Sequence, residues 1–175
     1  MSAEPAYEQL DRSLRRNGAV IMSVFAFVWS FGVPGFTDAT LQWTALVAGL
    51  LVALAIRGRP VQRKRRMPSE WLRRYNRVGL VQVVAIGPTI ATLIYLGQPA
   101  FIPAAVSLIV GVHFSPLALV FDQPRYVWTG VGLCVVGLIG ATSLTVASDE
   151  AARALVGVGA TAALWATSAH VTFRG

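Results

Sequence analysis

The chain has 175 residues, of which 55% are hydrophobic and only 13% charged, and its formal net charge at pH 7 is +7. Soluble domains carry about 25% charged residues, so this composition excludes an ordinary soluble globular protein. No charged stretch exceeds roughly 20 residues, which excludes a separate soluble domain. No nucleic-acid-binding module accompanies the positive charge, so we expect no nucleic-acid partner. The lone cysteine, Cys134, excludes an intramolecular disulfide.

Six apolar segments predict an all-α, polytopic membrane bundle of six transmembrane helices that forms a single domain over residues 1–175. A span must cross about 30 Å of hydrocarbon, which takes about 20 residues. The first two segments are short, so a re-entrant hairpin is the alternative to two full crossings. The predicted spans are residues 18–34, 41–56, 78–96, 100–121, 126–147 and 152–173.

The first 17 residues are predicted to form a cytoplasmic N-terminal segment, with a short surface helix over residues 4–16. Arg15 and Arg16 precede an apolar stretch, as basic residues do in a secretory signal peptide. No clean small-x-small cleavage site follows, so we expect an uncleaved first span.

The connection between the second and third predicted spans, residues 57–77, is a basic cytoplasmic loop. Pro68 suits the first turn of a helix, and the aromatic and leucine residues after it are spaced as in an interfacial helix. We expect this loop either to bind anionic lipid headgroups or simply to fix the topology, and the second interpretation is favoured. The headgroup candidates are Arg63, Lys64, Arg65, Arg66, Trp71, Arg73 and Arg74.

Polar residues inside the third to sixth spans define the candidate functional site. His113 lies roughly 12 Å from the cytoplasmic end of its span, and an ionisable residue at that depth is a candidate for function. Pro116 frees the backbone carbonyl of Val112 beside it. The alternative is a neutral imidazole that simply bonds between helices. The substrate-path candidates are His113, Pro116, Gln82, Thr129, Thr167 and His170, with Ser23 at a similar depth.

The segment Gly111–Ala118 has the sequence GVHFSPLA. It resembles a motif of small bacterial multi-pass integral membrane proteins without an assigned function. The resemblance covers one of the six spans. It implies a multi-pass protein of the bacterial plasma (inner) membrane and adds no activity.

The last two spans are rich in small residues, including Gly137 with Ala141 and Gly159 with Ala163. Such small-x-x-x-small pairs permit close helix approach. We expect packing within one chain, with a homodimer as the alternative. Phe36 and Trp43-Thr44 also match Phe121 and Trp128-Thr129 at a constant offset. The match has two interpretations, a weak inverted repeat as in some transporters, or coincidence in a composition this biased.

The basic residues predict the orientation. With six spans, every Lys and Arg except Arg153 lies on one side of the membrane. Basic residues are retained in the cytoplasm, so both termini are predicted to be cytoplasmic.

Two functions remain from the sequence. The first is a small transporter or channel for a neutral or anionic solute, with a cytoplasm-facing cavity around His113. The second is a non-catalytic accessory protein that interacts with lipid through residues 57–77. An enzyme is the least favoured, because the spans contain two histidines and no carboxylate to join them. We therefore expect no catalytic residue, no metal and no cofactor.

Overall fold

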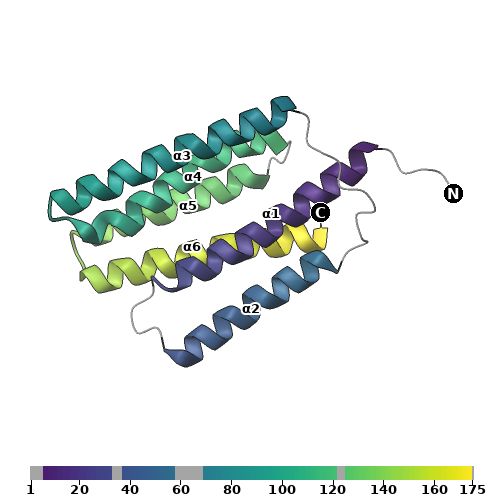
Figure 1. Ribbon diagram of the computed structural model, residues 1–175. Coiled ribbons are helices and arrows are strands. Elements are labelled where there is room, and N and C mark those ends of the chain that lie inside the picture. Colours follow the sequence, from purple (N-terminus) through teal and green to yellow (C-terminus); the bar gives the residue numbers. More distant parts are fainter. Residues whose placement is uncertain (1–5, 33–36, 58–68, 122–124, 175) are drawn as a thin grey trace.

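The computed structural model describes residues 6–32, 37–57, 69–121 and 125–174, and these residues form helices and no strand (Figure 1). The predicted all-α bundle is confirmed. The elements are α1 (Ala6–Ser30), α2 (Asp38–Ile56), α3 (Ser69–Tyr95), the short 3-10 helix η1 (Pro99–Phe101), α4 (Ile102–Phe121), α5 (Arg125–Ser143) and α6 (Asp149–Arg174).

Five stretches are long and apolar enough to cross a membrane: α2, residues 72–95 of α3, residues 99–119 across η1 and α4, α5, and residues 149–173 of α6. Many large hydrophobic side chains on these helices face outward, among them Trp43, Tyr95 and Leu119. This outer surface suits hydrocarbon rather than water. The apolar part of α1, from Gly18 to Ser30, is only about 20 Å long. The sixth crossing, by α1, therefore stays a prediction.

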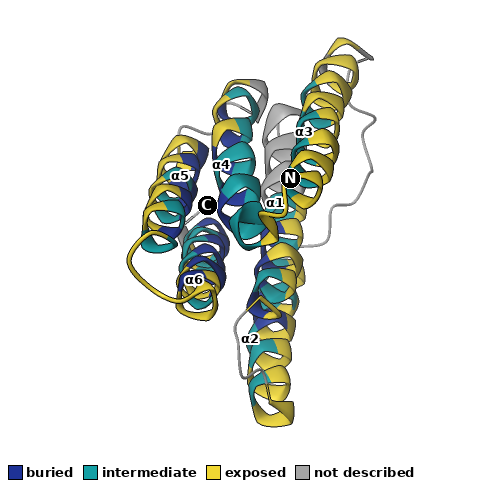
Figure 2. Ribbon diagram, turned by 90° about the vertical axis from the view of Figure 1, so that its left-hand side faces the viewer, coloured by how far each residue is buried: buried dark blue, intermediate teal, exposed yellow. Residues whose placement is uncertain are grey.

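Four helices form the core of the bundle. α4 packs on α5, α5 on α6, and α6 on α1. The other two helices are peripheral, since α3 attaches mainly to α4, while α2 attaches to α1 and α6 (Figure 2). None of residues 72–95 in α3 is buried, and in α2 only Ala48 and Leu51 are. We call the end of the bundle where α1 and α3 begin and α6 finishes the basic end, because Arg73, Arg74 and Arg125 lie there (Figure 1).

The α4–α5 seam is held close by small residues. A Cβ atom placed on Gly130 would lie 2.5 Å from the carbonyl oxygen of Gly111. One on Gly137 would lie 2.8 Å from the carbonyl oxygen of Ala104. The hydroxyl of Ser107 donates to the carbonyl of Leu133 across the same seam, at 2.9 Å. Here the small residues of the fifth span pack within one chain, as expected.

Two helices extend beyond the predicted spans. α1 runs without interruption from Ala6, and α3 runs without interruption from Ser69. The surface helix expected at residues 4–16 and the interfacial helix expected after Pro68 are therefore not separate elements. Within the described residues no proline separates either polar stretch from the apolar one, so the helix continues through the boundary. Pro88 and Pro116 lie inside α3 and α4, which both continue past them.

Candidate functional site

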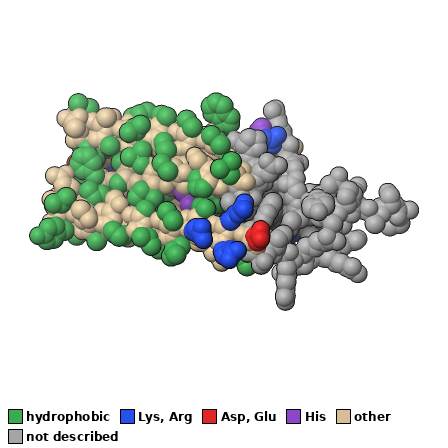
Figure 3. All heavy atoms as spheres, turned by 90° about the horizontal axis from the view of Figure 1, so that it is seen from above, with side chains coloured by type: hydrophobic (Ala, Val, Ile, Leu, Met, Phe, Trp, Pro, Cys, Tyr) green, Lys and Arg blue, Asp and Glu red, His purple; other side chains and the backbone are tan. Residues whose placement is uncertain are grey.

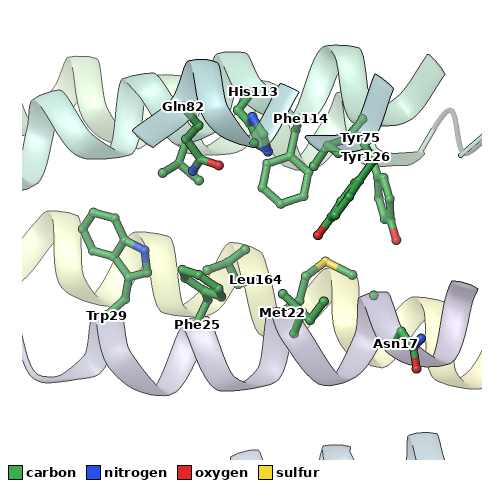
Figure 4. A pocket seen from close by; sticks show the side chains of 15 residues that line it. Asn17, Met22, Phe25, Trp29, Tyr75, Gln82, His113, Phe114, Tyr126 and Leu164 are labelled. Carbon is green, nitrogen blue, oxygen red and sulfur yellow. The ribbon is translucent and has the colours of Figure 1, made fainter. Parts of the chain in front are cut away.

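α1 and α3 lie on the same side of the bundle but barely touch, and a groove separates them. Its floor comes from α4, α5 and α6. Near the basic end the groove widens into a cavity of about 370 Å³, which we call the proximal cavity (Figure 4). It is lined by Asn17, Gly18, Ile21, Met22, Phe25, Trp29, Tyr75, Gly79, Gln82, Val110, His113, Phe114, Leu117, Tyr126 and Leu164.

Helical spacing builds the two walls. On α3 the lining residues Tyr75, Gly79 and Gln82 recur every three or four positions, so they share one face. On α1 the lining residues follow the same helical spacing and share one face: Asn17, Ile21, Met22, Phe25 and Trp29. A Cβ atom on Gly79 would meet nothing within 4 Å, so the α3 wall leaves free space at this point.

His113 and Gln82 are the two predicted residues that the structure brings together. His113 comes from α4 and Gln82 from α3, and both point into the groove toward Phe25 and Leu164 on the other side (Figure 4). The imidazole of His113 is hydrogen-bonded to the backbone of Val78 on α3. This bond links α3 to α4 and fixes the ring at the cavity wall.

Aromatic rings make up much of the remaining lining. Phe114 and Tyr126 meet edge to face, with ring centroids 5.8 Å apart and planes at 84°. Phe25 and Trp29 face them from α1, and Tyr75 stands on α3 near the basic end (Figure 4). No Asp, Glu, Lys or Arg side chain lines the proximal cavity among the residues described. The cavity therefore offers apolar surface and uncharged polar groups.

A second cavity of about 320 Å³ continues the groove away from the basic end, and we call it the distal cavity. The two cavities share Phe25, Trp29, Gln82 and Val110, so they form one groove along α1 and α3. The distal cavity is otherwise lined by apolar side chains and backbone until Arg153, at its far end.

Five of the polar-path residues named from the sequence line neither cavity. The hydroxyls of Thr129 and Thr167 are 2.8 Å apart, so they bond α5 to α6 instead of facing the groove. Ser23 pairs in the same way with Ser168, at 2.7 Å, and joins α1 to α6. Pro116 and His170 are half-buried, and neither lines the proximal or the distal cavity. Of the groups expected to converge on one cavity, the structure brings His113 and Gln82 to the groove. The hydroxyls instead pair across other helix interfaces, as hydroxyls do in apolar surroundings.

Two of the predicted headgroup residues, Arg73 and Arg74, lie at the basic end and line neither cavity. Arg73 and Arg74 are exposed at the start of α3. Figure 3 shows Lys and Arg side chains gathered at this end, beside a surface covered with hydrophobic side chains. Arg63, Lys64, Arg65 and Arg66 lie outside the described residues, and Trp71 belongs to α3 but its side chain is not described.

Sequence reasoning missed the aromatic lining of the site. Phe25, Trp29, Phe114 and Tyr126 lie in predicted apolar spans, where an aromatic residue is ordinary, and Tyr75 lies in the basic segment 57–77. The repeat of Tyr75, Gly79 and Gln82 on one helical face was a usable signal.

The chain matches no family model, no curated protein and no solved structure. In the described part of the chain, no three His, Cys, Asp or Glu side chains are grouped so that they could hold a metal ion.

Proposed function

We propose that the chain is an integral protein of the bacterial plasma membrane that crosses it six times, with both termini and the basic end in the cytoplasm. Its positive side chains support this orientation, because basic residues are retained on the cytoplasmic side. α1 supports the sixth crossing by packing along α6, itself long enough to span, with Ala19, Met22 and Ala26 buried.

In this protein the groove between α1 and α3 is the substrate site of a small carrier for an uncharged amphipathic molecule. The observation that carries this function is the lining of the proximal cavity, where His113 and Gln82 stand among apolar and aromatic walls. An apolar cavity with a few convergent polar groups is the usual form of a small-molecule site.

The lining argues against a charged substrate. A charged group moved from water into an apolar site is stable only when it is paired. The described lining of the proximal cavity has no carboxylate, lysine or arginine to pair with it. Arg153 lies at the far end of the distal cavity, away from His113. Of the neutral and anionic solutes that the sequence left open, the neutral one is therefore favoured at the proximal cavity.

The substrate reaches the site from the bilayer. The lining residues Ile21 and Phe25 are 48% and 52% exposed, so the groove is open along the side of the bundle. In a membrane that side faces lipid, and an amphipathic molecule can slide in between α1 and α3 without crossing the core.

A photoreactive long-chain fatty alcohol tests this function in the purified protein reconstituted in vesicles. We expect it to label α1 and α3 peptides that line the groove, and unlabelled alcohol to displace that label. Peptides of α2 serve as the internal control, because Trp43, Leu46 and Leu50 are exposed and line neither the proximal nor the distal cavity. Labelling of α2 and the groove alike, without displacement, would mean that the groove only contacts solvent lipid.

A second function rests on the arginines at the start of α3. Arg73, Arg74 and Arg77 are exposed next to apolar surface at the basic end. Arginines in this position bind anionic lipid headgroups at the cytoplasmic face. This contact suits an accessory, lipid-interacting protein, and it is independent of the groove.

A further inference from the structure

The groove is specific enough to indicate the class of its ligand, an inference that rests on the proposed function. We propose that the ligand is a membrane quinone or its quinol, with the oxygen-bearing ring in the proximal cavity and the apolar tail in the distal cavity. Three independent features support this: an amide without a partner, a set of aromatic walls, and a tail-sized extension of the groove.

The amide belongs to Gln82, which sits where the two cavities meet. Among the residues that the structure describes, it has no hydrogen-bond partner, and Figure 4 shows it pointing into the groove. An amide that faces hydrocarbon without a hydrogen-bond partner is unfavourable. A ligand oxygen that accepts from this amide removes that cost, so the site is built for a polar atom at this depth.

His113 stands on the same wall, one helix away from Gln82 (Figure 4). Its bond to the Val78 backbone positions the imidazole and leaves the ring edge at the cavity. Ring carbonyls accept hydrogen bonds, and quinol hydroxyls both donate and accept. Because the imidazole donates to Val78, its other nitrogen can only accept. A quinol hydroxyl can therefore donate to that nitrogen and accept from the amide, whereas a quinone carbonyl can accept from the amide alone.

The shape of the ligand's polar part follows from the aromatic side chains. Phe25 and Trp29 on the α1 wall and Phe114 and Tyr126 on the floor enclose the cavity. Aromatic rings gain stabilisation from a flat ring placed against their faces or edges. A glycerol or a sugar head has no flat ring and would leave that gain unused.

The distal cavity is the proposed binding site for the apolar tail of the ligand. From Gln82 the distal cavity runs along Val28 of α1, Ile86 of α3 and Val106 of α4. These side chains give an apolar channel beside the ring site, open to the bilayer. A head with an apolar chain attached at one edge fits both cavities at once.

The experiment is a competition for the groove. The photoreactive fatty alcohol labels the protein while unlabelled competitors are added: a benzoquinone with a short alkyl tail, its quinol, and a diacylglycerol. We expect the quinone or quinol to displace the label at concentrations about tenfold below those of the diacylglycerol. Gln82→Leu keeps the size of the side chain and removes the amide, so it should reduce that advantage at least about fivefold. Gln42→Leu makes the same change on the exposed surface of α2 and should leave the advantage intact.

The two proposals fail differently. If all competitors displace the label equally, or if Gln82→Leu changes nothing, the quinone proposal is overturned while the groove remains a site for an amphipathic molecule. If the groove is never labelled above α2, the proposed function falls as well.

Discussion

The α4–α5 seam and the α1–α3 groove are two ways of placing neighbouring helices in the same bundle. In the seam, glycines bring the backbones so close that a single added Cβ atom would strike a carbonyl oxygen. In the groove, an added Cβ on Gly79 meets open space, although the residue type is the same. What lies opposite a glycine, and not the glycine itself, determines whether two helices are in close contact there.

The difference between the seam and the groove shows how a small helix bundle can be stable and still contain a cavity. Contacts between small residues and between hydroxyls hold α1, α4, α5 and α6 together. α3 attaches mainly to α4, and its other face is left free to form the wall of a cavity. The stability of the bundle and the shape of the site should therefore respond to different mutations.

The largest effect is expected at the seam. Gly130→Leu would drive a side chain into the Gly111 carbonyl and the Phe114 Cβ, 3.0 Å away, neither of which can move without shifting α4. We expect a loss of about 3 kcal/mol or more in the free energy of unfolding, measured by denaturation in detergent micelles. Gly87→Leu is the control, because nothing lies within 4 Å of its added Cβ. Equal losses for the two variants would refute the close seam.

A smaller loss is expected where α1 meets α6. The hydroxyl of Ser168 lies 2.9 Å from the carbonyl oxygen of Ala19 and 2.7 Å from the hydroxyl of Ser23. Ser168→Ala removes this buried link, and we expect it to lower the free energy of unfolding by about 1 kcal/mol. Adding Ser23→Ala should then cost less than it does alone, because the two hydroxyls share one interaction. Fully additive losses would mean that the pair is not coupled.

Replacing each of the two histidines should have a different effect on ligand binding. His113 lines the groove, whereas His170 lines neither cavity. His113→Ala should weaken displacement of the photoreactive alcohol by the quinol about fivefold, since one hydrogen bond is lost. His170→Ala should leave it unchanged. Similar results for both variants would place the polar group of the ligand elsewhere.

The smallest effect on the fold is expected at the basic end. Arg73→Gln combined with Arg74→Gln removes two exposed charges and should change the free energy of unfolding by less than about 0.5 kcal/mol. The same variant should retain less anionic lipid when the protein is purified, which lipid analysis by mass spectrometry measures. Unchanged lipid retention would leave these arginines without a headgroup role.

The sequence was sufficient for the helices and for part of the site. Apolar runs and missing charges predicted the all-α bundle, because hydrocarbon requires them of any helix that crosses it. Depth along a helix singled out His113 and Gln82. Depth alone also grouped them with Thr129 and Thr167, which lie on other interfaces. Which face a membrane helix turns inward depends on packing, and the hydrophobic pattern says little when both lipid and core are apolar.

The central claim is that the space between α1 and α3 holds a ligand. Native mass spectrometry of the protein purified from its membrane tests it most directly, with Gly79→Phe and Gly87→Phe as the matched pair. Both glycines have open space around them, but only Gly79 lines the groove. We expect the wild type and Gly87→Phe to carry one uncharged lipid-like molecule for each chain, and Gly79→Phe to be folded and empty. The same bound molecule in all three proteins would contradict the account.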